Sequence, residues 1–256
     1  MIHCRAMRCL WPILSLFLAF IFLSVGSWAQ TLSIEQIEQS RAQVTDADIR
    51  AVSAKVDELS GNLSAIWTKI LVDNNKDSRL PQLKGFTTGS FPCGEYVLGK
   101  NTLAYCSPDD TIYYDKVLMA AFVRLTAAHD HDSGMYGALV AFAHEWGHAI
   151  YRRSGETTGI LEEAAADCFA GVAMRALERM HSVNADDLKD ARYSLTLAAD
   201  AFENTDLRPG VKTILDQGVH GAASGRIESF DIGYNHGAPA CTSKLPVQLN
   251  SAPWRQ

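Results

Sequence analysis

The pattern of hydrophobic and polar positions predicts a mainly helical chain. From Ile49 to Ile70, apolar residues recur at alternating intervals of three and four, which is the period of one buried helix face. Thr45 stands where a threonine can cap the start of this helix, and Gly61 is expected to break or bend it. Further helical patterns cover residues 116–128, 135–153, 160–180, 184–203 and 224–233.

Short extended segments lie between the first long helix and those that follow. Glycines and a Ser-Pro-Asp-Asp turn separate them, and they cover residues 83–87, 96–98, 102–106 and 111–115. We expect a small, mainly antiparallel sheet beside the helix at 135–153, which makes the fold class α+β and mainly helical. Segment 111–115 is the candidate edge, where an extended peptide could add as a further strand; a purely structural strand is the alternative.

The first 29 residues have a different pattern. Two arginines precede an almost unbroken apolar run from residue 10 to 25, and Ser27-Trp28-Ala29 has small residues at the two positions that a signal peptidase reads. The run is short for a membrane span and contains Pro12. We therefore expect a secretory signal cleaved after Ala29 and a periplasmic or extracellular protein. An uncleaved anchor formed by residues 10–29 is the alternative.

The chain is expected to have three parts. Residues 1–29 form the signal peptide, residues 30–80 a helical segment, and residues 81–256 the main domain. The sequence leaves open whether residues 30–80 are a pro-region that is removed on activation or the first helices of the domain.

Composition indicates a folded protein and gives no sign of a nucleic-acid partner. The 256 residues are 47% hydrophobic, which is enough for a domain with a real core. The net charge of -6 gives no electrostatic reason to expect a nucleic acid as partner.

Four cysteines follow the predicted signal, an even number that indicates disulfides in an exported chain. Cys93 and Cys106 bracket a predicted hairpin and form the natural first pair. Cys168 with Cys241 follows by elimination. Zinc binding by cysteines is the alternative, but no Cys-x-x-Cys spacing supports it.

One predicted helix carries a pattern of metal-ligand residues, His144-Glu145-Trp146-Gly147-His148. Histidines four residues apart project from the same helix face, so both imidazoles can reach one tetrahedral metal ion. Glu145 lies beside them, where its carboxylate can take a proton from an attacking water, as in zinc peptidases. A chance pentapeptide on a buried helix is the alternative. Gly147 lowers helix propensity and indicates a close approach of backbone or substrate.

A catalytic zinc site needs a third protein ligand, and the following helix offers one. A third histidine six residues after His148 is excluded, because that position is Ser154. Glu163 can face the metal instead. Asp167 lies one turn later on the same face, where it can accept a hydrogen bond from a ligand histidine and fix its tautomer.

Two other glutamates compete with Glu163 for this place. Glu162 has Ala166 one turn later, so no carboxylate would be there to orient a histidine, and Glu156 lies in a loop. Favourable charge at the helix N-terminus is the better explanation of Glu162. For Glu163, taken together with the pentapeptide at 144–148, metal binding is the better explanation.

Several short motifs between residues 60 and 241 resemble, in order, the neutral zinc metallopeptidases of bacteria. The motifs are Cys93-Gly94, Tyr105-Cys106, Ile112-Tyr113-Tyr114-Asp115, the pentapeptide at 144–148, Glu163-Ala164-Ala165-Ala166-Asp167-Cys168-Phe169-Ala170-Gly171, and His220-Gly221 with Arg226. The resemblance implies a zincin-like, gluzincin-type domain. It also implies one zinc ion per chain, with Glu145 as base and the ligands His144, His148 and Glu163.

The expected function is zinc-dependent hydrolysis of peptide bonds in exported or envelope proteins. The oxyanion of the reaction needs a further donor, and the candidates are His220, Arg226, Tyr151 and Tyr234. Purely structural roles for His220 and Arg226 are equally open. The expected partner is a peptide or protein substrate, with membrane contact only if the signal stays uncleaved. A non-catalytic, zinc-stabilised binding or scaffolding protein is the alternative, although it gives no reason for a carboxylate at Glu145.

Overall fold

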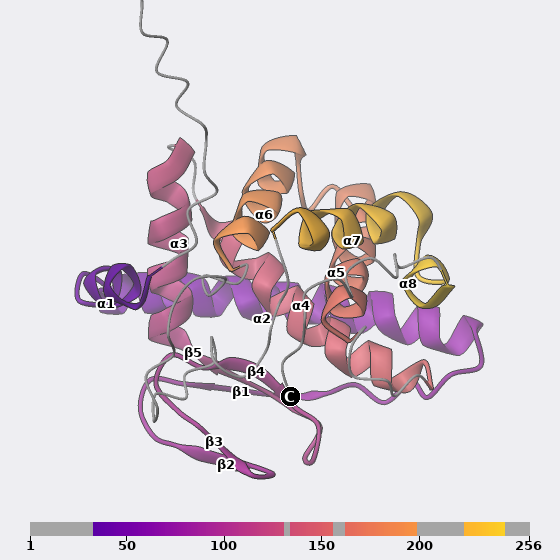
Figure 1. Ribbon diagram of the computed structural model, residues 1–256, viewed down its shortest axis with the longest axis horizontal. Coiled ribbons are helices and arrows are strands. Elements are labelled where there is room, and N and C mark those ends of the chain that lie inside the picture. Colours follow the sequence, from indigo (N-terminus) through magenta and orange to yellow (C-terminus); the bar gives the residue numbers. More distant parts are fainter. Residues whose placement is uncertain (1–32, 131–133, 156–161, 199–222, 244–256) are drawn as a thin grey trace, which may run out of the picture.

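The structure is a computed structural model, and it describes residues 33–130, 134–155, 162–198 and 223–243. Within these ranges, helices make up most of the molecule, and the strands lie together at one side of it (Figure 1). The helices are α1 Ile34–Arg41, α2 Asp46–Asp73, α3 Lys116–Asp130, α4 Met135–Arg153, α5 Glu162–Arg179, α6 Ala185–Leu197, α7 Ala223–His236 and α8 Ala240–Ser243. The strands are β1 Gln82–Phe86, β2 Phe91–Cys93, β3 Tyr96–Leu98, β4 Leu103–Cys106 and β5 Thr111–Asp115.

The α+β, mainly helical fold class expected from the sequence is confirmed. The helical patterns correspond to α2 through α7, and all four expected strands occur within one residue of their expected bounds, as β1, β3, β4 and β5. Strand β2 was not expected. None of the helices in the described ranges combines the length and the apolar composition that a membrane span requires.

Helix α2 forms for the reason that its sequence suggests. Thr45 caps it: the Asp48 N–H donates to the Thr45 hydroxyl at 3.3 Å, and the Thr45 N–H donates to the Asp48 carboxylate at 2.9 Å. The helix runs through Gly61 without a break, because one glycine costs about 1 kcal/mol while a whole apolar face becomes buried. That face comprises Val52, Val56, Leu59, Leu63, Trp67 and Leu71.

The expected place of segment 111–115 at the sheet edge is wrong. Strand β5 lies in the centre of a three-stranded sheet with the order β1-β5-β4, and all five of its residues are buried. The hairpin turn gives it β4 as one antiparallel neighbour, and β1 pairs with it in parallel on the other side. The three-stranded sheet is therefore mixed, and only the hairpin β2–β3 and the pair β4–β5 are antiparallel. Strand β4 is the sheet edge that lies next to α4.

Helix α4 is the buried centre of the helical part, and glycines let its neighbours approach closely. A Cβ atom on Gly147 would lie 2.4 Å from the carbonyl oxygen of Ala166 in α5. The close approach that the sequence indicated at Gly147 is therefore one of backbone against backbone. In the same way, Cβ atoms on Gly171 and Gly233 would lie 2.0 and 1.8 Å from carbonyl oxygens across the α5–α7 contact. Helix α5 is thereby held against both α4 and α7.

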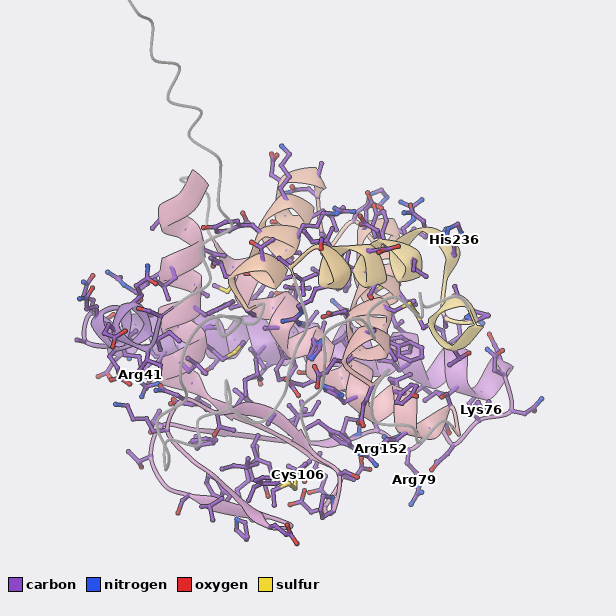
Figure 2. The ribbon with its side chains drawn as sticks, viewed as in Figure 1. Arg41, Lys76, Arg79, Cys106, Arg152 and His236 are labelled. Atoms are coloured by element: carbon purple, nitrogen blue, oxygen red, sulfur yellow. A yellow bond between two sulfur atoms is a disulfide. The ribbon has the colours of Figure 1, made fainter. Side chains whose placement is uncertain are left out.

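The two N-terminal helices pack against the segments that follow them. The buried face of α2 belongs to the same hydrophobic cluster as α4 and α5. In addition, Arg41 in α1 (labelled in Figure 2) contacts the buried carboxylate of Asp115 at 2.6 Å. This carboxylate also accepts the Val117 N–H at the start of α3. Helix α2 thus packs in one core with the segments that follow, and Ile37 of α1 packs in a smaller cluster with Leu197 of α6.

The structure contains both disulfides that the sequence analysis expected. Cys93–Cys106 joins β2 to β4, and Cys168–Cys241 joins α5 to α8. Each bridge ties a short element to one that lies beside α4. Cys106 ends the edge strand β4, and Cys168 follows Asp167 in α5.

Candidate metal centre

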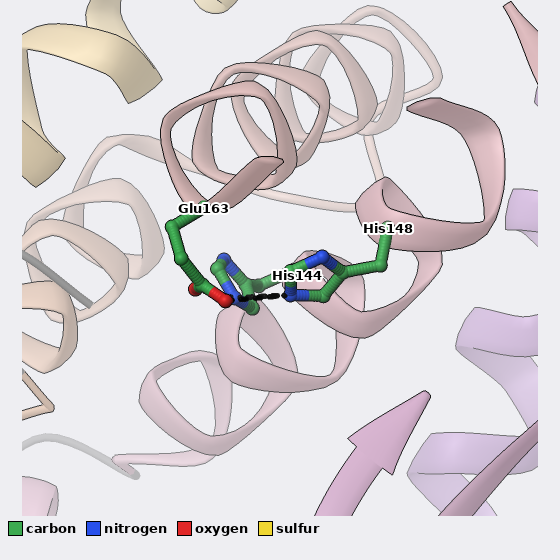
Figure 3. A group of neighbouring side chains, drawn as sticks. All are labelled: His144, His148 and Glu163. Atoms are coloured by element: carbon green, nitrogen blue, oxygen red, sulfur yellow. Dashed lines mark hydrogen bonds and ion pairs between the residues drawn. The ribbon is translucent and has the colours of Figure 1, made fainter. Parts of the chain in front are cut away.

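Three side chains from two helices converge on one point. His144 and His148 project from α4, and Glu163 reaches them from the first turn of α5 (Figure 3). The two Nε2 atoms lie 3.1 Å apart, and the Glu163 carboxylate oxygens lie 3.2 Å from Nε2 of His144 and 3.5 Å from Nε2 of His148. Tetrahedral zinc with bonds of about 2.05 Å places its ligand atoms about 3.3 Å apart. The donor set therefore fits zinc in both chemistry and spacing.

This donor set stands alone among the residues that the structure describes. No other group of histidine, cysteine, aspartate and glutamate side chains in the described ranges is close enough to hold a metal ion. The two histidines are 2% and 9% exposed, so the donors face a largely dehydrated site.

The Nδ1 atom of His144 faces a buried ion pair. It lies 2.8 Å from the Asp167 carboxylate, as the spacing of Glu163 and Asp167 suggested. Arg226 in α7 donates two hydrogen bonds to the same carboxylate, from Nε at 2.8 Å and from Nη2 at 2.7 Å. A third bond runs from Arg226 Nη1 to the Ala198 carbonyl at 2.7 Å. When Nε2 of His144 binds a metal, Nδ1 carries the proton and donates it to Asp167.

These contacts shift the pKa values of the buried groups. Burial by itself lowers the pKa of His144, but the Asp167 and Glu163 carboxylates outweigh it and raise the pKa to about 10. Burial by itself raises the pKa of Asp167, but Arg226 and His144 outweigh it and lower the pKa. The raised pKa favours the imidazolium form of His144, with protons on both nitrogens, in the metal-free chain. Metal binding at Nε2 therefore displaces the proton on that nitrogen.

A carboxylate that the sequence analysis assigned to the helix N-terminus lies at the second histidine. Glu162 Oε1 is 3.5 Å from Nδ1 of His148 and 3.3 Å from Nη2 of Arg152. Burial lowers the pKa of His148, but Glu163 and Glu162 outweigh it and raise the pKa. A pair of adjacent glutamates on the first turn of α5 was the signal that could have indicated this contact, since neighbouring helix positions point in directions about 100° apart.

Glu145 lies between the two histidines in sequence and faces the sheet. Its Oε2 accepts a hydrogen bond from the main-chain N–H of Tyr105 at 2.8 Å, and the residue is 7% exposed. Because Tyr105 is in β4, the edge strand itself fixes the direction of this carboxylate. Nothing in the sequence pattern indicates a contact between a main-chain group and a side chain forty residues away.

A further set of contacts holds the edge strand against α4. Arg153, in the last turn of α4, donates two hydrogen bonds to Asp110 at 2.8 and 2.7 Å, and it also donates to the carbonyl of Arg79. The Tyr105 hydroxyl donates to the same Asp110 carboxylate at 2.9 Å. We call Arg153, Asp110 and Tyr105 the strand clamp. It links the end of α4, the β4–β5 turn and the strand that contacts Glu145.

The remaining candidates for an oxyanion donor lie in different places. Within the described residues, the hydrogen bonds of Arg226 go to Asp167, Ala198 and the Nδ1 side of His144, away from the converging Nε2 atoms. Tyr151 is 3% exposed in the core, and the Tyr234 hydroxyl donates to Glu178 at 2.7 Å. His220 and Glu156 lie outside the described residues. The oxyanion donor stays a prediction.

Comparison with known proteins assigns the chain to one family. A family model described as "Putative neutral zinc metallopeptidase" matches residues 21–244, a range that contains all three converging residues and Glu145. No curated protein and no solved structure matched the chain. The match covers well over half of the 256 residues. The chain therefore belongs to the family of putative neutral zinc metallopeptidases.

Proposed function

We propose that this chain is an exported zinc peptidase in which His144, His148 and Glu163 hold the metal and Glu145 is the general base. The observation that carries the proposal is the convergence of three donor side chains, whose nearest nitrogen and oxygen atoms lie 3.1–3.5 Å apart, beside a carboxylate that faces a sheet edge. A binding protein stabilised by zinc needs the three donors but has no use for that carboxylate.

The roles of the chain's own residues follow from their contacts. When bound, zinc activates a water molecule and polarises the peptide carbonyl. Glu145 takes a proton from the attacking water and delivers it to the leaving amine. The Tyr105 N–H keeps the Glu145 carboxylate directed at the space next to the edge strand. Asp167 and Arg226 hold the His144 ring so that Nε2 faces the metal.

Strand β4 is the surface that suits an extended substrate. Within the described residues it has a strand neighbour, β5, on one side only. The Tyr105 N–H points away from β5, to Glu145 in α4. Main-chain groups of residues two apart in a strand point to the same side, so those of Leu103 also point away from β5, to the side without a strand neighbour. A peptide that paired there would add a strand to the sheet and bring its scissile bond towards Glu145.

Two features support the exported location. The predicted signal at residues 1–29 lies outside the described residues, and two disulfides are typical of proteins in oxidising compartments. The substrate class that we propose is therefore a peptide or an unfolded segment of an exported or envelope protein.

The test compares the chain with its Glu145→Gln variant, both loaded with equal amounts of zinc and offered an unfolded protein and a mixed peptide library. We expect the unmodified chain to cut and the variant to lose about 10²–10⁴-fold in turnover, because general base catalysis contributes that much. Retained zinc in the variant shows that the base, and not the metal, was removed. Intact peptides with both zinc-loaded proteins would overturn the peptidase proposal and favour the zinc-stabilised binding protein.

A further inference from the structure

One contact of a proposed metal ligand, between Glu162 and His148, has no role in the proposed reaction. Glu162 is adjacent to the ligand Glu163, but its carboxylate lies at the opposite nitrogen of His148. Glu163 approaches Nε2 of His148 at 3.5 Å, and Glu162 approaches Nδ1 at 3.5 Å. The first turn of α5 thus presents one carboxylate to each nitrogen of the same imidazole.

Two simpler roles of Glu162 account for less of this geometry. Favourable charge at the helix N-terminus explains why an acidic residue stands in the first turn, but not why it faces His148. A role as metal ligand does not fit either, because the converging atoms of both histidines are Nε2 and Glu162 lies on the Nδ1 side. A group at Nδ1 can act on the metal only through the ring.

We propose that Glu162 is a positioning residue for the metal, with Arg152 as its partner. Its carboxylate accepts the Nδ1–H of His148, which selects the tautomer whose Nε2 is the metal-binding atom and fixes the ring angle. Arg152 Nη2, 3.3 Å from the same oxygen, holds the carboxylate in place. This inference deepens the proposed function and rests on it.

The carboxylates that orient the two ligand histidines differ in burial and in the length of their contacts. Asp167 at His144 is 1% exposed and has two hydrogen bonds from a buried arginine. The side chains of Glu162 and Arg152 are 22% and 42% exposed, and their contacts are longer. Residues that orient a ligand histidine typically contribute 10- to 100-fold to metal affinity, so we expect about 10-fold from Glu162 and about 100-fold from Asp167.

The test measures the zinc dissociation constant of the purified chain by competition with a chromophoric chelator. Glu162→Ala is compared with Glu178→Ala, a matched control on the same helix whose carboxylate pairs with a partly exposed arginine, Arg175, far from the histidines. We expect Glu162→Ala to weaken zinc binding about 10-fold and Glu178→Ala to change it by less than about 2-fold. Glu162→Gln keeps an acceptor oxygen and should recover part of the loss.

Cobalt in place of zinc gives a second measurement that a purely structural role would not change. The visible absorption of bound Co²⁺ reports ligand geometry, so its bands should shift in Glu162→Ala and stay unchanged in Glu178→Ala. Zinc affinity and cobalt spectrum both unchanged in Glu162→Ala would overturn the inference and leave the peptidase proposal intact. A different outcome separates the two proposals. If Glu162→Ala binds zinc more weakly than Glu178→Ala and the unmodified chain, but the unmodified chain cuts no peptide, then Glu162 is supported as a positioning residue and the peptidase proposal is overturned.

Discussion

Helix α4 is held in different ways on the side facing α5 and α7 and on the side facing β4. On the first side, Asp167 and Arg226 are 1% and 4% exposed and form a bidentate pair. On the second side, the strand clamp includes the Asp110 side chain, which is 41% exposed. Buried pairs have few alternatives to their contacts, whereas exposed carboxylates can exchange protein partners for water.

The difference corresponds to what each side has to do in the proposed reaction. Metal ligands need one fixed geometry, which the dehydrated contacts with α5 and α7 provide. The base has to meet a substrate, so it faces the sheet edge; Glu145 itself is 7% exposed, and the contacts that hold the edge strand include the partly exposed Asp110. The comparison predicts that changes on the helical side mainly affect stability and metal affinity, and that changes on the sheet side mainly affect turnover.

The largest effect on stability is expected from Asp167→Ala. The variant leaves Arg226 as a buried charge without its carboxylate, which costs about 3–5 kcal/mol of the free energy of unfolding. Urea unfolding in the presence of EDTA measures this without a contribution from zinc. The control is Asp231→Ala, which removes a partly exposed partner of Arg192 and should cost only about 0–1 kcal/mol. Equal losses in the two variants would contradict the difference between the buried and the exposed pair.

Zinc binding at the helical side should raise the free energy of unfolding of the chain by an amount comparable to the loss in Asp167→Ala. A ligand that binds only the folded chain adds about 2.7 kcal/mol at a concentration 100 times its dissociation constant. We expect this increment between chelator-treated and zinc-saturated protein, measured by urea unfolding. In Glu163→Gln the increment should largely disappear at the same zinc concentration, because one of three donors is weakened. A Glu163→Gln variant with the full increment would show that the metal is held elsewhere.

A smaller loss is expected from Gly147→Ala, which tests the contact between α4 and α5. The new Cβ would lie 2.4 Å from the Ala166 carbonyl oxygen, so α5 has to shift, at a cost of about 1–3 kcal/mol. The shift moves Glu163 away from the histidines, and zinc affinity should fall as well. Gly61→Ala is the control, because nothing lies within 4 Å of its Cβ and the helix gains about 0.5–1 kcal/mol. A neutral Gly147→Ala would contradict the close packing.

The smallest effect on stability is expected from the strand clamp. Asp110→Asn weakens the bonds from Arg153 and Tyr105 and should cost at most about 1 kcal/mol, because the carboxylate is partly exposed. Turnover should nevertheless fall about 10-fold, since the strand that directs Glu145 is displaced, while zinc affinity stays unchanged.

The matched control for the clamp is Asp109→Asn. Asp109 is the neighbouring turn residue, and it accepts a hydrogen bond from Tyr113 in the central strand instead of Tyr105. Its variant should keep normal turnover. A loss of zinc affinity in Asp110→Asn together with its turnover would show that the two sides of α4 are not separable.

The local features of the fold were predictable because they depend on neighbours in sequence. The capped helix from Asp46, the apolar face of α2 and the pentapeptide on α4 all follow from spacings of three and four. The pair Glu163 and Asp167 follows from the same rule, since residues four apart share a helix face. The pair Cys93 and Cys106 followed from the predicted hairpin between them, and Cys168 with Cys241 followed by elimination.

What the sequence could not give depends on contacts between distant segments. The parallel pairing of β1 with β5 moves segment 111–115 from the edge to the centre of the sheet and makes β4 the edge. Likewise, Gly147 had a visible cost in helix propensity, but only the approach of Ala166 gives its reason. Pairing partners far apart in sequence leave no periodic signal in either segment.

The sequence by itself determined which side chains are the proposed donors, because residue type and helical period indicate two imidazoles on one helix face and a carboxylate on the next helix. The tertiary structure alone decided what surrounds them: Arg226 on Asp167, Glu162 at Nδ1 of His148 and the Tyr105 N–H on Glu145. The physical reason is that hydrogen bonds act only within about 3.5 Å, a condition that packing between elements fulfils and sequence spacing does not specify.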